Sequence, residues 1–243
     1  MDKYHNIIFN HEYDWESIIK QIYLDKYNYS DNLNNIHQLL DSDNISCSDK
    51  EYYNIKPVFG KNDRQSFLVK DYYNYYDSNQ IIKKKYTDFI LKYIKPLFNE
   101  EIIYQTTPNI RFHLPNCTNI GCRSSDPNNE IIGLHYDNEF GHPSSEINVI
   151  IPITDMYESN SIYFNNINNE LDYNDYNNLK LNKNNYFLGY FNKVFHYNKI
   201  NKTNKTRVSF DFRIIPKSLY KDNNNISATN KNKFIIGDYY SII

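Results

Sequence analysis

Short segments rich in β-branched and aromatic residues fill the chain after Glu101. Pro, Gly, Asn and Asp separate these segments, which is the pattern of short strands joined by turns. Strands that follow one another at such spacing are typical of a β-sandwich or a β-barrel. The predicted strands cover residues 102–104, 110–114, 130–137, 147–153, 161–164, 186–191 and 206–215.

The first hundred residues have helical periodicity instead. A short helix is predicted after Asp14, which can cap it, and a second helix over residues 33–40. The clearest helix is predicted over residues 78–97, with Ser78 as its cap and Pro96 near its end. Residues 41–65 are polar, and we expect them to be irregular. The chain is therefore expected to be an α+β protein, with N-terminal helices packed on one face of a barrel-like core.

The chain has 243 residues, enough to bury one sizeable core. We expect a single domain over residues 1–243, with a mainly helical part (1–100), a β-core (101–216) and a C-terminal extension (217–243). The stretch 165–185 is rich in Asn and Asp, which predicts a long loop with one extra strand at 179–181. The extension is polar until Phe234, where an apolar run is expected to dock on the core.

Charge and cysteine content exclude several classes of protein. The formal net charge is −2 with no long block of like charges, which argues against a nucleic-acid partner. No apolar run is long enough for a membrane span, and no signal peptide is recognisable near Met1. Cys47, Cys117 and Cys122 are odd in number and widely spaced, which is typical of a reducing compartment. We therefore expect a cytoplasmic protein.

One cluster has the spacing of a metal site. His135 and Asp137 are two positions apart in a predicted strand, so both side chains point to the same face and Tyr136 points away. His196 follows 61 residues later and can supply a third ligand from another strand. Two imidazoles and one carboxylate form the facial triad of non-haem iron(II) oxygenases, which leaves coordination positions open for a chelating cosubstrate and dioxygen.

A second constellation begins eleven residues after His196. Residues 206–213 alternate strictly, with an apolar face of Val and Phe and a polar face that starts with Arg207 and Ser209. Such a polar face makes chemical sense if it lines a barrel interior beside a metal. Arg207 can bind a carboxylate through two parallel hydrogen bonds, and Ser209 can add a third from the same side.

Six blocks, in chain order, resemble the StrG-like 2-oxoglutarate- and iron(II)-dependent oxygenases, a group related to phytanoyl-CoA dioxygenase-like enzymes. The blocks are IRFHLP at 110–115, GLHYDNEFGHPSSEIN at 133–148, IPIT at 151–154, NSIY at 160–163, HYN at 196–198 and TRVSFDFR at 206–213. The resemblance covers about residues 66–216. It departs from the family in the stretch 165–185, which lacks the usual Gly-containing turn, and it does not extend to the first 65 residues.

The resemblance implies a double-stranded β-helix core, that is, a cupin-like jelly roll. It implies iron(II), 2-oxoglutarate and O2 as cofactor and cosubstrates, with succinate and CO2 released as a substrate is hydroxylated. By position, His135, Asp137 and His196 would hold the metal, and Arg207 would bind the distal carboxylate of 2-oxoglutarate. Because Asp137 is present, halogenation is disfavoured. Charge also balances, since a dication, Asp137 and Arg207 together offset the dianion.

Several neighbours leave alternatives open. Asn148 either donates to the bound cosubstrate or positions the substrate, or it bonds to a neighbouring side chain inside the barrel. Arg111 and His113 share a strand face and are candidates for binding substrate, Arg111 through an anionic group. His142 follows Gly141 in a turn and is expected to be a turn residue, not a fourth ligand. Arg213 is expected to be structural, paired with Asp211 or a terminal carboxylate.

The function expected from these features is hydroxylation of a small polar metabolite or sugar-like compound. One alternative is a non-catalytic jelly roll that keeps a metal site and acts as a binding or scaffold protein. Another is an oxygenase that acts on a macromolecule. The expected partner is a small-molecule substrate, with no membrane; the sequence gives no oligomeric state, and fold analogy does not identify the substrate.

Overall fold

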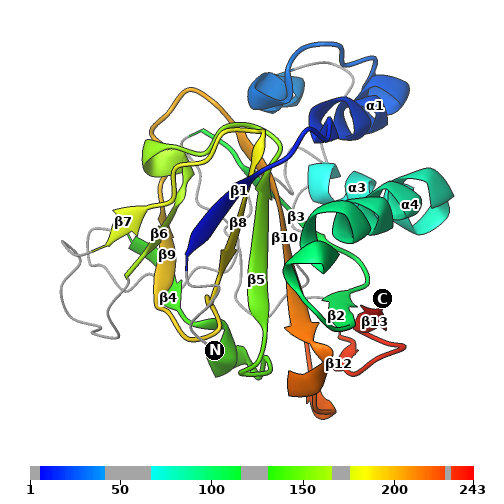
Figure 1. The fold of residues 1–243 in the computed structure, drawn as a ribbon. Coiled ribbons are helices and arrows are strands. Elements are labelled where there is room, and N and C mark those ends of the chain that lie inside the picture. Colours follow the sequence, from blue (N-terminus) through cyan, green and yellow to red (C-terminus); the bar gives the residue numbers. More distant parts are fainter. Residues whose placement is uncertain (1–5, 42–66, 116–130, 166–175, 228–230) are drawn as a thin grey trace.

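The computed structural model describes residues 6–41, 67–115, 131–165, 176–227 and 231–243. Helices from the first part of the chain cover one side of a large antiparallel sheet, and a smaller sheet lies on the other side (Figure 1). The expected mixture of helices and antiparallel sheet is therefore confirmed. The three cysteines, and nearly all of the stretch predicted to be irregular at 41–65, lie outside the described residues.

The large sheet has seven strands, all paired antiparallel. Its central strand is the longest, β10 (Arg207–Pro216), which pairs with β5 on one side and with β2 and β3 on the other. The other strands are β1 (Ile7–Asn10), β8 (Asn185–Gly189), β5 (Ile147–Pro152), β2 (Ile102–Gln105), β13 (Tyr240–Ile242) and β3 (Asn109–His113).

The small sheet has four antiparallel strands in the order β4-β9-β6-β7. They are β4 (Ile131–His135), β9 (His196–Lys199), β6 (Ile162–Phe164) and β7 (Asn177–Asn178). The C-terminal extension adds a separate hairpin of β11 (Asn223–Ile226) and β12 (Lys233–Phe234). Phe234 is fully buried in a cluster with Ile103 of β2 and Ile215 of β10, so the extension docks on the core.

Helices α1 (Trp15–Tyr27), α3 (Phe67–Ser78) and α4 (Gln80–Phe89) form the helical layer. Asp14 caps α1 as predicted, because its side chain accepts from the backbone N–H of Ser17 at 3.1 Å. α4 continues into a π-helical turn, η3, and a 3-10 turn, η4. The short elements are η2 (Leu33–Asp41), η3 (Ile90–Ile94), η4 (Lys95–Leu97), η5 (Asp137–Phe140), η6 (Glu158–Asn160) and η8 (Lys217–Leu219).

The prediction that Ser78 caps a helix over 78–97 is wrong in register. Ser78 ends α3, where its hydroxyl donates to the carbonyls of Asn74 and Tyr75. The cap of α4 is Asn79, whose side chain accepts from the N–H groups of Ile81 and Ile82. Ser and Asn both favour helix ends. Which of the two caps α4 depends on where the preceding helix α3 ends.

The helices and the large sheet enclose the main apolar core. Val208, Phe210 and Phe212 of β10 face the helices and are buried. Trp15 of α1 meets the Phe210 ring edge-on at 5.1 Å between ring centroids, and Tyr86 of α4 meets Phe212 in the same way at 5.1 Å. The apolar half of the β10 alternation therefore faces the helices, so its polar half must face the small sheet.

A second, smaller apolar cluster lies on that other side of the large sheet. It includes Ile150 of β5 and Phe187 of β8 from the large sheet and Phe164 of β6 from the small one. The two sheets therefore pack against each other through side chains, and the polar residues of β10 lie beside this contact. Among the described residues, no helix is long and apolar enough to cross a membrane.

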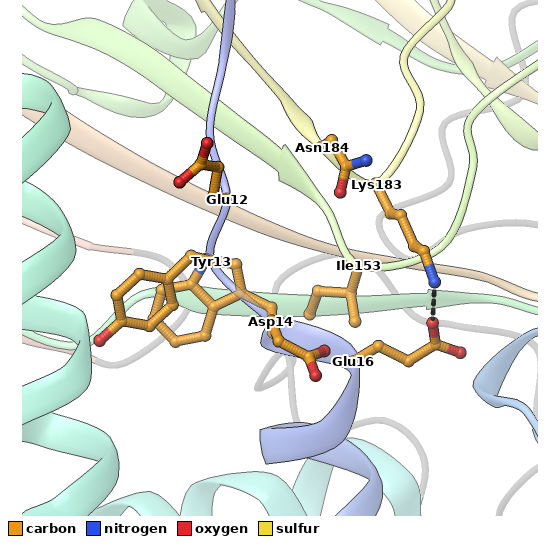
Figure 2. Close-up of a pocket in the computed structure, with 8 residues that line it drawn as sticks. Glu12, Tyr13, Asp14, Glu16, Ile153, Lys183 and Asn184 are labelled. Atoms are coloured by element: carbon orange, nitrogen blue, oxygen red, sulfur yellow. Dashed lines mark hydrogen bonds and ion pairs between the residues drawn. The ribbon is translucent and has the colours of Figure 1, made fainter.

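A pocket of about 190 Å³ opens beside the start of α1 (Figure 2). Lys183 and Glu16 both line the pocket, and their ammonium and carboxylate groups form an ion pair at 2.9 Å. Its other lining residues are Glu12, Tyr13, Asp14, Trp15, Ile153 and Asn184. None of the residues with the spacing of a metal site contributes to this pocket.

Candidate metal centre

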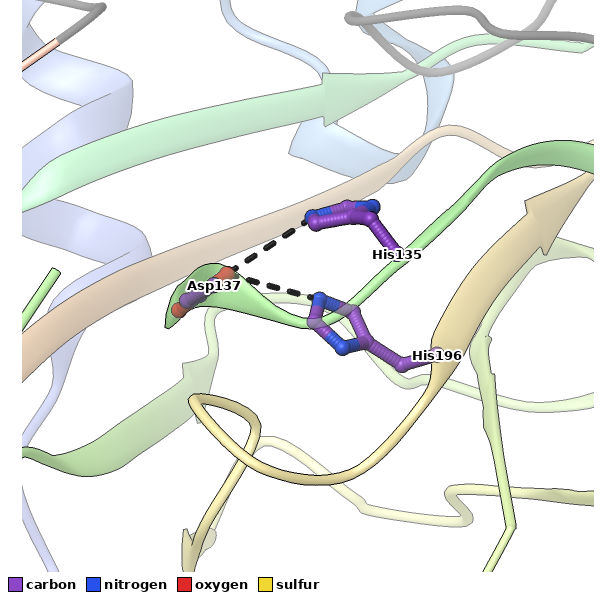
Figure 3. Close-up of side chains that lie close together, drawn as sticks. All are labelled: His135, Asp137 and His196. Carbon is purple, nitrogen blue, oxygen red and sulfur yellow. Dashed lines mark ion pairs between the residues drawn. The ribbon is translucent and has the colours of Figure 1, made fainter. Parts of the chain in front are cut away.

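His135, Asp137 and His196 come together in the structure (Figure 3). Each residue offers one ligand atom, and the three atoms lie within 4.8 Å of one another. Asp137 and His196 are buried, and His135 is partly exposed. Residues far apart in the sequence thus form the cluster that the spacing predicted.

Strand pairing brings the two imidazoles together. His135 is the last residue of β4 and His196 the first of β9, and the two are register partners with ring centroids 4.3 Å apart. Phe191 stacks on the His196 ring at 4.7 Å, which fixes its plane from the other side. The imidazoles therefore lie at the end of the small sheet, next to the large one.

Asp137 lies beside the two imidazoles, although the strand predicted over residues 130–137 is shorter in the structure. The strand ends at His135, and Asp137 begins η5. Its backbone N–H donates to the carbonyl of Phe191 at 2.9 Å instead of to a ladder partner. Tyr136 between them is extended, with φ −122° and ψ 145°, so the side chains of His135 and Asp137 still share one side. The Tyr136 ring turns away and meets Phe195 at 5.0 Å.

The two oxygens of the Asp137 carboxylate have different surroundings. Oδ1 lies 3.6 Å from Nε2 of His135 and 3.7 Å from Nε2 of His196. Oδ2 accepts hydrogen bonds from Nδ2 of Asn148 at 2.8 Å and from Nη2 of Arg213 at 2.7 Å. The Oδ1 separations are longer than a hydrogen bond and leave room for an ion held at roughly 2.0–2.2 Å from each ligand atom.

Asp137 is held as a carboxylate. Burial opposes its ionisation, but attraction to Arg213 and the proximity of His135 and His196 hold the pKa of Asp137 well below its ordinary value. The charged form is the one that binds a metal ion.

The tautomer of His196 follows from the hydrogen-bond partner of its Nδ1 atom. Nδ1 lies 3.0 Å from the backbone carbonyl of Val194, which can only accept, so Nδ1 carries the proton. The Nε2 lone pair then points toward Asp137. Burial, with the nearby His135, lowers the pKa of His196 to about 4, so the ring is neutral near pH 7. A neutral imidazole whose other nitrogen donates to a carbonyl is the usual arrangement of a metal ligand.

Arg207 is the most unusual charged group in the described part of the chain. Its side chain is fully buried, and none of its three guanidinium nitrogens has a hydrogen-bond partner among the described residues. Burial, together with the charge of Arg111, lowers the pKa of Arg207 to about 9, while Asp211 raises it. The group remains positive at neutral pH, and a buried charge left without a partner is costly.

The polar face of β10 runs between Arg207 and the metal cluster. Ser209 is buried on this face, and Arg213 at its far end contacts Asp137. Arg207 is the register partner of His113, and Ser209 of Arg111, so β3 contributes both of its predicted site residues to the same face. The interior face that the sequence predicted therefore exists, with Arg207 at one end and the metal cluster at the other.

The predicted neighbours occupy defined places. Asn148 bonds to Asp137, a neighbouring side chain on the interior face, and whether it also binds the cosubstrate or substrate stays a prediction. His113 is fully buried, with Nδ1 3.1 Å from the carbonyl of Asn160. Arg111 is partly exposed and pairs with Asp211 at 3.5 Å. Whether Arg111 or His113 binds a substrate stays a prediction.

His142 and Arg213 occupy the places expected of them, with one addition. His142 lies 2.8 Å from the carboxylate of the buried Glu146, and this pair accounts for its ring in the turn. Arg213 forms the expected ion pair with Asp211 at 3.1 Å. Its contact with Asp137 is not evident from the sequence, although the alternation from Arg207 to Arg213 predicts that its side chain lies on the interior face.

No protein-family model matches the chain. It is 26% identical over 205 residues to the streptomycin biosynthesis protein StrG of Streptomyces griseus, an alignment that covers 78% of this chain and 90% of that protein.

Solved structures align more remotely. A non-heme monooxygenase, the ThoJ–nickel complex, aligns at 10% identity and a TM-score of 0.43 over 87% of this chain and 73% of its own. HygX of Streptomyces hygroscopicus, with nickel and 2-oxoglutarate bound, aligns at 10% identity and a TM-score of 0.34. This alignment covers 71% of this chain and 88% of HygX. Over most of its length, then, this chain is similar in sequence to the streptomycin biosynthesis protein StrG.

Proposed function

We propose that this protein is an iron(II)- and 2-oxoglutarate-dependent oxygenase that hydroxylates a small polar or sugar-like molecule and releases succinate and CO2. The observation that carries the proposal is the buried guanidinium of Arg207, which has no hydrogen-bond partner among the described residues and lies on the same interior face as the His135, Asp137 and His196 cluster. Neither feature by itself indicates this chemistry. Together they provide a cation site and an anion site inside one fold.

The strand order supports a jelly-roll core. From β3 to β10 the chain crosses from one sheet to the other at every step except between β6 and β7. Strands β3, β5, β8 and β10 belong to the large sheet, and β4, β6, β7 and β9 to the small one. Eight strands divided between two sheets in this way are what a jelly roll requires. The 26% identity to StrG also agrees with the motif blocks, which resemble the StrG-like oxygenases.

The donor set suits a non-haem iron(II) ion. Two imidazole nitrogens and one carboxylate oxygen leave coordination positions open. When bound, iron(II) would supply the activation of dioxygen and the oxidative decarboxylation of 2-oxoglutarate. His196 is neutral and Asp137 is ionised before any metal arrives, so neither has to lose a proton at neutral pH to bind it.

Arg207 suits the distal carboxylate of 2-oxoglutarate. A carboxylate can accept two parallel hydrogen bonds from one guanidinium, which would satisfy donors that have no partner in the described part of the chain. Ser209, two positions along the strand, shares the face of Arg207 and can add a hydroxyl donor. In an interior that excludes water these charge-assisted bonds are strong, and they orient the cosubstrate toward the metal cluster.

A decarboxylation assay tests the proposal and separates it from a non-catalytic scaffold. The protein, with iron(II), ascorbate, 2-oxoglutarate and air, is expected to form succinate slowly even without its own substrate. An Asp137→Ala variant, which lacks the carboxylate ligand, is expected to form none above background. If the unmodified protein forms no succinate with any of a panel of small polar and sugar-like compounds, the oxygenase proposal fails and the binding or scaffold alternative is favoured.

A further inference from the structure

The carboxylate of Asp137 is held from one side only. Asn148 and Arg213 both donate to Oδ2, and neither donates to Oδ1, which faces the two imidazoles. An oxygen that already accepts from an amide and a guanidinium has little remaining capacity to bind a metal. The structure therefore distinguishes two carboxylate oxygens that are chemically equivalent in water.

Both donors stand on rigid backbone. Asn148 lies on β5 and Arg213 on β10, and the two are register partners in adjacent strands of the large sheet. Their exposed fractions are 1% and 5%, so neither side chain can swing into solvent. The guanidinium of Arg213 is also held by Asp211, through Nη1 at 3.1 Å from Oδ1. The position of the Asp137 carboxylate is thus set by the large sheet, although the imidazoles belong to the small one.

We propose that Asn148 and Arg213 are positioning residues that keep Asp137 a one-oxygen ligand of the metal. This inference rests on the proposed function. A triad that supplies one atom per residue leaves three positions of an octahedral ion open, two for a chelating 2-oxo acid and one for dioxygen. If Oδ2 were released, it could take one of these positions, and the carboxylate could also rotate away from the imidazoles.

The first test replaces the neutral donor. Asn148→Leu keeps the number and branching of the side-chain heavy atoms and removes the amide that donates to Oδ2. Binding of Co(II) chloride, measured by calorimetry without 2-oxoglutarate, is expected to weaken by about 10- to 100-fold, as is typical when a partner of a metal ligand is lost. The visible Co(II) bands, which report coordination number and geometry, are expected to change in intensity in the same variant.

A matched control is Asn201→Leu. Asn201 is also fully buried, and its amide donates to the carbonyls of His113 and Lys205 at 2.8 Å, with no contact to Asp137. This variant is expected to melt at a lower temperature, because a buried hydrogen-bonding group is lost, while its folded form binds Co(II) as the unmodified protein does. Loss of stability alone is thereby separated from loss of ligand positioning.

A second variant covers the case in which Asn148→Leu does not fold. Arg213→Lys keeps the positive charge opposite Asp137, but a single ammonium cannot reproduce the planar fork that contacts Asp137 and Asp211 together. It too is expected to bind Co(II) more weakly and to give altered visible bands.

Three outcomes would overturn the inference. The first is a folded Asn148→Leu protein whose Co(II) affinity stays within about 2-fold of the unmodified protein, well short of the usual effect, with the same spectrum. The second is Asn148→Leu with weaker 2-oxoglutarate binding but unchanged Co(II) binding, which would make Asn148 a cosubstrate ligand. The third is an unmodified protein that does not bind Co(II), and only this one also removes the proposed function.

Discussion

Replacement of Arg207 by Met is expected to stabilise the ligand-free protein and to weaken the binding of 2-oxoglutarate by about 2–4 kcal/mol, or roughly 30- to 1,000-fold. Both effects have one cause. The Arg207 guanidinium is buried without a hydrogen-bond partner among the described residues, so it costs stability until an anion arrives. Met fills a similar space without the charge, and removes the group that would bind the distal carboxylate.

The same substitution at Arg213 is the control, and the expected sign for stability is the opposite. Arg213 pairs with Asp137 and Asp211, so Arg213→Met leaves a buried carboxylate without its cation and is expected to cost about 3–5 kcal/mol of stability. Thermal melts of the ligand-free proteins and calorimetric titration with 2-oxoglutarate measure both quantities. An Arg207→Met protein that melts earlier and binds 2-oxoglutarate with unchanged affinity would refute the assignment of Arg207.

His196→Ala is expected to remove metal binding and turnover together. The ring is fixed by its Nδ1 contact with Val194 and by the Phe191 stack, which direct its Nε2 toward Asp137. Two remaining ligands hold iron(II) poorly, and succinate formation should fall below detection. Iron content after dialysis and succinate yield are the measurements.

His142→Ala provides the comparison for His196→Ala. His142 belongs to the same region of the fold, but its ring is engaged by Glu146. The variant is expected to lose some stability and to keep its iron. A His142→Ala protein without iron, or a His196→Ala protein that retains both iron and turnover, would mean that the ligand set is wrong.

The polar face of β10 could be predicted from the sequence because alternation in a strand is a local property. Val208, Phe210 and Phe212 had to face one way, and Arg207 and Ser209 the other. The partner of Arg213 could not be predicted in the same way. Its contact with Asp137 depends on how β10, β5 and the turn after β4 are brought together, which local periodicity does not report.

Local periodicity also fails to predict strands β9 and β1, because both form through pairing with distant strands. Strand β9 begins with His196 and contains few apolar residues, and its pairing with β4 and β6 is what makes it a strand. Strand β1 lies before the first helix, and it exists because β8 offers it a free edge. By contrast, the prediction that the side chains of His135 and Asp137 point to the same side holds although the strand is shorter than predicted. It holds because Tyr136 has an extended backbone even though it is not part of the strand.

The central claim is that one interior holds both a metal ion and a dicarboxylate. Anaerobic titration of the protein with iron(II) and then 2-oxoglutarate tests it most directly, because a 2-oxo acid chelated to iron(II) gives a weak visible charge-transfer band. The band is expected to develop with the unmodified protein, to need much higher 2-oxoglutarate with Arg207→Met, and to be absent with His196→Ala. If the unmodified protein gives no band at saturating iron(II) and 2-oxoglutarate, the metal cluster and Arg207 do not serve one site.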